Sequence, residues 1–145
     1  MKLLIQRVKE ASVTVDQKLI SKIENGLLVF IGFSEDDDES KLDWLVNKLI
    51  NLRIFEDNQG KMNLSLRDLD YNILLISQFT LYANCSRGRR PDFTSAAKAE
   101  LAEKLYNEFA YRLEVNYKKA LTGIFGADMK VALLNDGPVT IILEK

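Results

Sequence analysis

The stretch Leu27-Leu28-Val29-Phe30-Ile31-Gly32-Phe33 contains no polar side chain. An apolar run of this length without alternation predicts a β-strand that is buried on both faces. Residues 2–8, 11–16 and 18–24, which precede it, have the composition of short strands. Asn25-Gly26 lies between two apolar runs, where this pair is typical of a tight turn. We therefore expect a tight turn directly before the buried strand.

Two amphipathic helices are predicted after this strand. The first covers roughly residues 39–52, and the carboxylates before it lie favourably at its N-terminus. Its apolar side chains at helical spacing are Leu42, Leu45, Val46, Leu49 and Ile50. The second runs from about residue 94 to 115, and Asp92, Thr94 or Ser95 is expected to cap it. Its apolar side chains at four-residue steps are Leu101, Leu105, Phe109 and Leu113.

The remaining segments add strands. A second largely buried strand is predicted at residues 72–82, and a short strand at 53–56 precedes a turn at 57–60. The tail is expected to form strands near residues 119–125, 129–135 and 138–144. The pattern predicts one α/β domain over residues 1–145. Its mixed β-sheet is expected to be open or curled toward a barrel, with two main amphipathic helices packed outside.

Composition excludes several kinds of catalytic site. The 145 residues include no histidine, so Ser-His-Asp triads, Cys-His pairs and histidine-liganded zinc are all impossible. The one cysteine, Cys85, excludes an internal disulfide and a cysteine-rich zinc site, and is expected to be a free thiol in a loop. We expect no cofactor and no metal, although magnesium bound by carboxylates stays open.

The termini and the charge suggest where the protein acts. Arg7 interrupts the N-terminal apolar residues too early for a signal peptide, and no apolar run matches a bilayer span, so a cytoplasmic location is expected. A net charge of -1 argues against a generic nucleic-acid coat protein. The acidic residues 35–39 are expected to form a solvated loop. Arg87-Gly88-Arg89-Arg90 is either another solvated loop or a phosphate-binding site.

Two polar strings are candidates for chemistry. Ser77-Gln78-Phe79-Thr80 ends the predicted strand at 72–82, so Ser77 and Phe79 should face one way and Gln78 and Thr80 the other. This is either an ordinary strand end or a site without a side-chain base. Gly137-Pro138 follows Asn135-Asp136 at the start of an apolar strand. It is either a hairpin turn or a site feature, and the sequence does not give the isomer of its peptide bond.

A set of strings in fixed order spans the chain. They are Gln6-Arg7-Val8, Ala11-Ser12-Val13-Thr14-Val15, Asn51-Leu52-Arg53-Ile54-Phe55, Lys61-Met62-Asn63-Leu64-Ser65, Ser77-Gln78-Phe79-Thr80-Leu81-Tyr82-Ala83, Gly88-Arg89-Arg90-Pro91, Thr122-Gly123-Ile124-Phe125-Gly126-Ala127-Asp128-Met129 and Asn135-Asp136-Gly137-Pro138-Val139-Thr140. With these strings the chain resembles, over essentially its whole length, the D-aminoacyl-tRNA deacylases, which clear D-amino acids from tRNA. The loop Asn84-Cys85-Ser86-Arg87 departs from the family, in which an acidic or threonine-containing stretch with lysine precedes the glycine.

The resemblance implies a homodimer with active sites at the subunit interface. In this family the Gly-Pro bond, here Gly137-Pro138, is cis and inserts into the partner's site. Its carbonyl oxygens exclude an L side chain but admit a D side chain or the hydrogen of glycine. Arg7 resembles the residue that helps to hold this motif in orientation.

The resemblance also implies a chemistry without histidine. A backbone N–H near Phe79 polarises the ester carbonyl, and the 2′-hydroxyl of the terminal adenosine helps to position or activate water. Ser77 and Thr80 shape the pocket, Gln78 binds substrate, and nucleophilic attack by Thr80 is a second mechanism. Phe125 and Met129 either line the adenosine pocket or pack in the core. The tRNA phosphates are assigned to Arg87, Arg89 and Arg90.

The resulting hypothesis is a metal-independent esterase of translation quality control. It hydrolyses D-aminoacyl-tRNA, and also glycine mischarged on non-cognate tRNA, releasing the amino acid and tRNA. The alternative is a non-catalytic nucleic-acid-binding module that uses only the basic loop. Catalysis needs residues 77–80 and Gly137-Pro138 to converge across a dimer, whereas binding does not.

Overall fold

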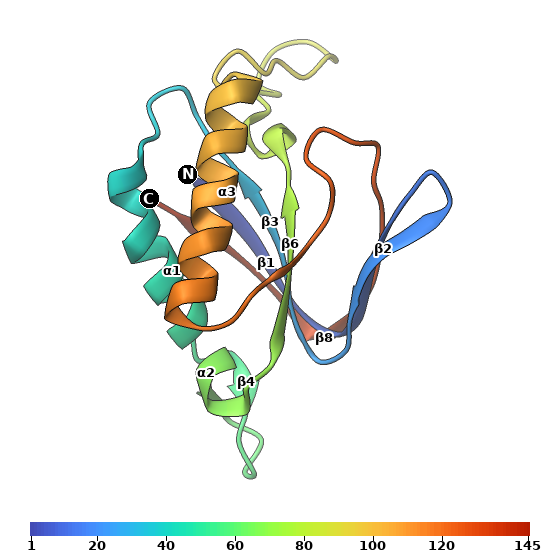
Figure 1. The fold of residues 1–145 in the computed structure, drawn as a ribbon, viewed down its shortest axis with the longest axis vertical. Helices are drawn as coiled ribbons and strands as arrows, with labels where there is room; N and C mark the ends of the chain where they lie inside the picture. The colour runs from blue at the N-terminus through green and yellow to red at the C-terminus, as the bar shows by residue number, and fades with distance from the viewer.

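The computed structural model describes residues 1–145, which form a curled β-sheet with two main helices packed on one face (Figure 1). The strands are β1 (Lys2–Val15), β2 (Lys18–Ile23), β3 (Gly26–Gly32), β4 (Phe55–Glu56), β5 (Met62–Leu64), β6 (Asn72–Ser77), β7 (Leu121–Thr122) and β8 (Lys130–Glu144). The helices are α1 (Leu42–Asn51), α2 (Leu66–Leu69) and α3 (Ala99–Asn116), with 3-10 turns η1 (Glu39–Lys41) and η2 (Phe79–Tyr82).

Strand β1 organises the main sheet. It pairs antiparallel with β8 along one edge, and with β3 and then β2 along the other. Strand β6 lies parallel to β3, and β7 lies parallel to β6. The sheet is therefore mixed, and it curls into a nearly closed, barrel-like shape with α1 and α3 outside, which confirms the predicted fold class (Figure 1).

The predicted tight turn at Asn25-Gly26 is wrong. Strands β2 and β3 both run antiparallel to β1, so the chain bends here without reversing. Gly26 instead permits a close approach of β6, because an added Cβ would collide with the carbonyl oxygen of Asn72. The reversal comes earlier, at Asp16 and Gln17, whose φ angles of 47° and 63° make a left-handed two-residue hairpin turn.

The two main helices pack on the outer face of the curled sheet, and the larger hydrophobic core lies between them and the sheet. All five apolar residues predicted for the first helix are buried, and α1 follows the short turn η1, which Asp38 caps. The predicted start of the second helix near residue 94 is wrong, since α3 begins at Ala99 without a side-chain cap. The candidate caps are used elsewhere: Asp92 accepts from the N–H of Thr94, and Ser95 donates to the carbonyl of Tyr82. No helix is long and apolar enough to span a membrane.

Several predicted strands have different bounds. The segment at 72–82 leaves the sheet after Ser77. The Gln78 N–H makes a last hydrogen bond to the carbonyl of Ile31 in β3, and the chain then turns into η2. The segments at 2–8 and 11–16 form one strand, β1, and only β7 remains of the strand near 119–125. The predicted strands near 129–135 and 138–144 are one strand, β8, whose pairing with β1 shifts register opposite residues 6–10.

The prediction of a solvated loop at residues 35–39 is wrong for Asp37, whose buried carboxylate connects the start of the chain to η2. Asp37 is 4% exposed and forms ion pairs with the Met1 ammonium at 2.7 Å and with Lys41 at 2.7 Å. It also accepts from the N–H of Ser34 and from the hydroxyl of Tyr82. Burial alone would raise the pKa of Asp37, but these hydrogen bonds and charges outweigh burial and lower the pKa.

Asp37→Asn should therefore lower the free energy of unfolding by about 3–5 kcal/mol at pH 7, because it leaves a buried ammonium without its partner. The pKa of Asp37 is depressed by folding, so its contribution is complete above the unfolded pKa and is lost as pH falls through the folded value. The difference between wild type and variant should shrink below about pH 4, measured by urea unfolding. Asp36→Asn, an exposed neighbour with the same charge change, should be nearly neutral, and equal losses in both variants would contradict this account.

Candidate functional site

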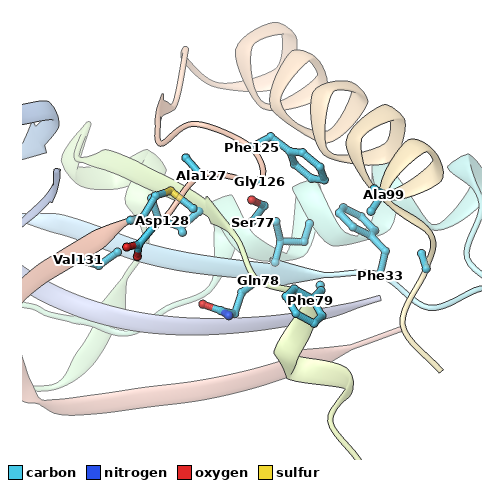
Figure 2. Close-up of a pocket in the computed structure, with 16 residues that line it drawn as sticks. Phe33, Ser77, Gln78, Phe79, Ala99, Phe125, Gly126, Ala127, Asp128 and Val131 are labelled. Atoms are coloured by element: carbon cyan, nitrogen blue, oxygen red, sulfur yellow. The ribbon is translucent and has the colours of Figure 1, made fainter. Parts of the chain in front are cut away.

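A cavity of about 490 Å³ opens where β6 ends, between the first turn of α3 and the segment that leads into β8 (Figure 2). Most of its lining is apolar, and its walls come from segments far apart in the chain. The lining residues are Ile31, Gly32, Phe33, Ile76, Ser77, Gln78, Phe79, Ala97, Ala99, Ala102, Phe125, Gly126, Ala127, Asp128, Met129 and Val131. The size and lining are those of a small-molecule site with a few polar groups.

Residues 77–79 form one rim of this cavity, whereas Thr80, the last residue of the string, is exposed and does not line it. Ser77, Gln78 and Phe79 all line it, so the predicted alternation of faces fails beyond the end of β6. Gln78 Nε2 donates to Thr80 Oγ1 at 2.6 Å, which fixes both side chains beside the opening. The Phe79 N–H begins η2 and has no intrahelical acceptor, and none of the loop or side-chain hydrogen bonds uses it. The Phe79 N–H is therefore without a protein acceptor, on a residue that lines the cavity.

Phe125 and Met129 line the opposite wall and also pack against the core. The Phe125 ring lies 5.8 Å from that of Tyr106 on α3. An added Cβ at Gly123 would collide with Met129 Sδ, so the glycine makes room for the thioether. Lining a pocket and packing in the core were the alternatives for Phe125 and Met129, and each residue does both.

No strong general base lies in the cavity. Asp128 is the only titratable side chain among the lining residues, and its carboxylate forms an ion pair with Lys130 at 2.8 Å. Tyr82, at the end of η2, has its pKa raised to about 12 by burial and by the charge of Asp37, so it stays protonated at neutral pH. No group of three or more metal-binding side chains occurs. Polar contacts and backbone donors are what the cavity offers to a substrate.

The Gly137-Pro138 segment lies outside this cavity. Both residues are exposed, the bond between them is cis, and neither lines the cavity of the same chain. Asn135 braces the loop, because its Oδ1 accepts from the Val139 N–H at 2.9 Å and its Nδ2 donates to the Val139 carbonyl at 3.2 Å. Of the two interpretations that the sequence left open, the hairpin turn is wrong, since these residues form an irregularity within β8.

Arg7 holds the Gly137-Pro138 segment through contacts of its buried guanidinium group. The residue is 4% exposed, and its Nε donates to the carbonyl of Asp136 at 2.9 Å. Its Nη1 donates to the carbonyl of Ile54 at 2.6 Å, and its Nε also forms an ion pair with the Asp136 carboxylate at 3.3 Å. The guanidinium thereby fixes the backbone immediately before Gly137.

The basic cluster lies on a loop that is closed at its base. Asn84 and Asp92 exchange two backbone hydrogen bonds of 2.7 and 2.9 Å. Between them, Arg87, Arg89 and Arg90 are exposed and form no ion pair with any acidic side chain. Cys85 is an exposed free thiol on the same loop. The three guanidinium groups are available to an anionic partner.

Sequence reasoning missed the wall that α3 contributes. Ala99 and Ala102 lie three residues apart on one helix face, and their small side chains leave the cavity open. The three-residue spacing of these alanines could have predicted an open wall only if the helix were already known to lie against the end of β6. Phe93, whose ring packs edge-to-face on Phe79 at 5.1 Å, was also missed.

Comparison with known proteins gives consistent matches. A family model described as D-Tyr-tRNA(Tyr) deacylase matches residues 4–144. Relatives named D-aminoacyl-tRNA deacylase, from Flavobacterium psychrophilum and Finegoldia magna, are 52% and 54% identical over 145 and 144 residues, each match covering 99% of this chain and 97% of the relative. A solved structure of a protein named "c-Myc DNA Unwinding Element Binding Protein" is 45% identical with a TM-score of 0.95, over 100% of this chain and 99% of its own. Another solved structure, described as "a probable eukaryotic D-amino acid tRNA deacylase", is similar in fold. It has a TM-score of 0.83 at 19% identity, and the match covers 98% of this chain and 97% of the other.

Proposed function

Because the chain belongs to the D-aminoacyl-tRNA deacylase family, and is thus a hydrolase of the ester between a D-amino acid and tRNA, we propose that its cavity holds the terminal adenosine with this ester. The observation that carries the proposal is the free Phe79 N–H at the rim of an apolar cavity of about 490 Å³. Phe125 and Met129 then contact the adenosine, and Gln78 contacts the aminoacyl group beside the opening.

The proposed reaction needs no side-chain nucleophile. Water attacks the ester carbonyl carbon, and the Phe79 N–H donates to the oxygen on which negative charge develops. The bond between the carbonyl carbon and the ribose oxygen breaks, and that oxygen takes the proton released by the water. Ser77 and Thr80 shape the site and orient the water, with the 2′-hydroxyl of the adenosine assisting. The aminoacyl ester is already activated, which suits a site without histidine.

Chiral selection is assigned to Gly137-Pro138 of a second subunit. The segment is exposed and braced, yet it does not reach the cavity of its own chain, so a homodimer is the simplest way to bring the two together. Strand β8 supports this proposal, since it pairs only with β1 and exposes Leu134 and Ile142 to 56% and 69%. Backbone carbonyls at this place would exclude an L side chain and admit a D side chain or glycine.

The remaining parts of the proposal concern the tRNA. Arg87, Arg89 and Arg90 contact its phosphates, and glycine mischarged on a non-cognate tRNA is a second substrate because it has no side chain to exclude. We place the protein in the cytoplasm, where aminoacyl-tRNA is used in translation.

Release of free amino acid tests the proposed function. Purified protein should hydrolyse D-tyrosyl-tRNA and glycyl-tRNA with multiple turnovers, at equal rates with and without EDTA. Binding of these tRNAs with no release of amino acid would contradict the proposal. It would favour the alternative, a nucleic-acid-binding module. The basic loop and the similarity to a protein named for DNA binding are the observations consistent with that alternative.

Thr80 provides a test of the mechanism. Thr80→Ser and Thr80→Ala should both keep kcat within about tenfold of wild type, because the backbone of Phe79 supplies the donor to the carbonyl oxygen. Loss of a true nucleophile lowers kcat by about 10⁶-fold in a well-studied hydrolase. Single-turnover assays on D-tyrosyl-tRNA measure the effect. Trapping of an aminoacyl group on Thr80 by mass spectrometry would show that the hydroxyl attacks and would overturn the backbone mechanism.

A further inference from the structure

Phe79 presents an aromatic surface at the rim of the cavity. Its side chain is 56% exposed, although its backbone is fixed where β6 ends. The ring of Phe93 packs against it with centroids 5.1 Å apart and an interplanar angle of 65°. Such edge-to-face contacts hold one ring in a defined orientation while the rest of its surface stays in water.

The support of this pair is rigid on both sides. On the Phe79 side, the Gln78 N–H donates to the carbonyl of Ile31 at 2.7 Å. On the Phe93 side, the preceding residue Asp92 closes the basic loop through its backbone pair with Asn84, and the Ala96 N–H donates to the Phe93 carbonyl at 3.0 Å. The aromatic pair therefore needs little ordering before it can bind a flat partner.

The position of the pair indicates what that partner is. Phe79 lies between the cavity on one side and, through Phe93, the loop that carries Arg87, Arg89 and Arg90 on the other. Under the proposed function the terminal adenosine fills the cavity, and the phosphates reach the arginines. The single strand that joins them must pass over the rim. Aromatic side chains flanked by basic residues are the usual platform on which single-stranded bases stack.

We propose that Phe79, buttressed by Phe93, stacks the base of the nucleotide that precedes the terminal adenosine. The inference rests on the proposed function and adds a second base-binding subsite to it. No other exposed aromatic of the chain combines these features. Trp44 is covered by the ammonium of Lys145 at 5.2 Å, and Tyr111 lies on α3 and does not line the cavity.

The test compares two full-length D-tyrosyl-tRNAs, one intact and one lacking only the base of the penultimate nucleotide. With wild-type protein, loss of this base should raise KM about tenfold, which is within the range for one base-aromatic stack. With Phe79→Leu, the same loss should change KM by less than about twofold, because the stacking ring is gone. With Phe93→Leu the ratio should fall well below tenfold, because the Phe79 ring loses the contact that orients it. The ratio of the two KM values cancels any effect of a substitution that is common to both substrates.

Tyr111→Leu is the matched control, since Tyr111 is 61% exposed but lies away from the cavity, and it should keep the wild-type ratio. The proposal is overturned if wild-type protein does not distinguish the two tRNAs, or if the Phe79 and Phe93 variants keep the tenfold ratio. Failure to hydrolyse even the intact tRNA is a different result, because it would overturn the proposed function itself.

Discussion

Replacing Arg87, Arg89 and Arg90 together by alanine should raise KM for D-aminoacyl-tRNA by about a hundredfold near physiological salt, while kcat changes little. The three guanidinium groups are exposed on a loop closed by Asn84 and Asp92, and they form no ion pair within the protein. Each phosphate contact releases counterions, so losing three should flatten the plot of log KM against log salt by about 2–3 units. Steady-state deacylation at several salt concentrations measures both quantities.

The control is a triple variant with the same change of net charge, Lys48→Ala, Lys61→Ala and Lys119→Ala. These lysines are exposed and form no ion pair, and their loss should leave most of the salt dependence intact. An equal effect of the two triple variants would mean that net charge acts, and not the loop. A fall in kcat with unchanged KM and salt slope would mean that the cluster has been misassigned.

Gly137→Ala should lower kcat/KM for D-aminoacyl-tRNA by about a hundredfold, the scale of a misplacement of about 1 Å in an active site. Gly137 has a φ of 135°, which L residues rarely adopt, and an added Cβ would lie 2.8 Å from Val139 Cγ2 and 3.0 Å from Arg7 Nη2. The loop must therefore move away from its Arg7 support. The remaining activity should be less biased against L-aminoacyl-tRNA, as measured with matched D and L substrates.

Gly60→Ala controls for backbone strain, because Gly60 has a φ of 73° in a distant turn with nothing within 4 Å of an added Cβ. It should leave activity unchanged. The subunit arrangement has its own check: mixing Gly137→Ala with the cavity-filling variant Ala99→Trp should restore part of the activity, since one shared site would then be intact. A monomer that is fully active and selective for D substrates would contradict the assignment of this loop to a partner.

Local patterns predicted the parts of the fold that depend on local physics. The apolar run at 27–33 is strand β3 and its continuation, and the helical spacing from Leu42 to Ile50 marks the buried face of α1. The pair Asn25-Gly26 wrongly predicted a tight turn. A glycine is needed at position 26 because strand β6 brings the carbonyl of Asn72 too close for any Cβ. A residue's propensity describes only its local sequence, so it cannot reveal a contact with a residue as far along the chain as Asn72.

The candidate site was predictable to a similar degree. The sequence singled out Ser77, Gln78 and Phe79, and the structure places all three on one cavity. It did not show that the chain leaves the sheet after Ser77 and enters η2, because Phe79 and Tyr82 are residue types that favour strands. The alanines of α3 were missed because a residue that leaves space has no chemical signal of its own.

The most direct test of the account is the ratio of deacylation rates for D- and L-tyrosyl-tRNA prepared on the same tRNA. Single-turnover hydrolysis with the enzyme in excess, in the presence of EDTA, gives both rates without interference from product release. Hydrolysis of the D ester should be at least about a hundredfold faster than that of the L ester, which is of the order that a shaped site achieves by exclusion. Equal rates for the two esters, or no release from either, would contradict it.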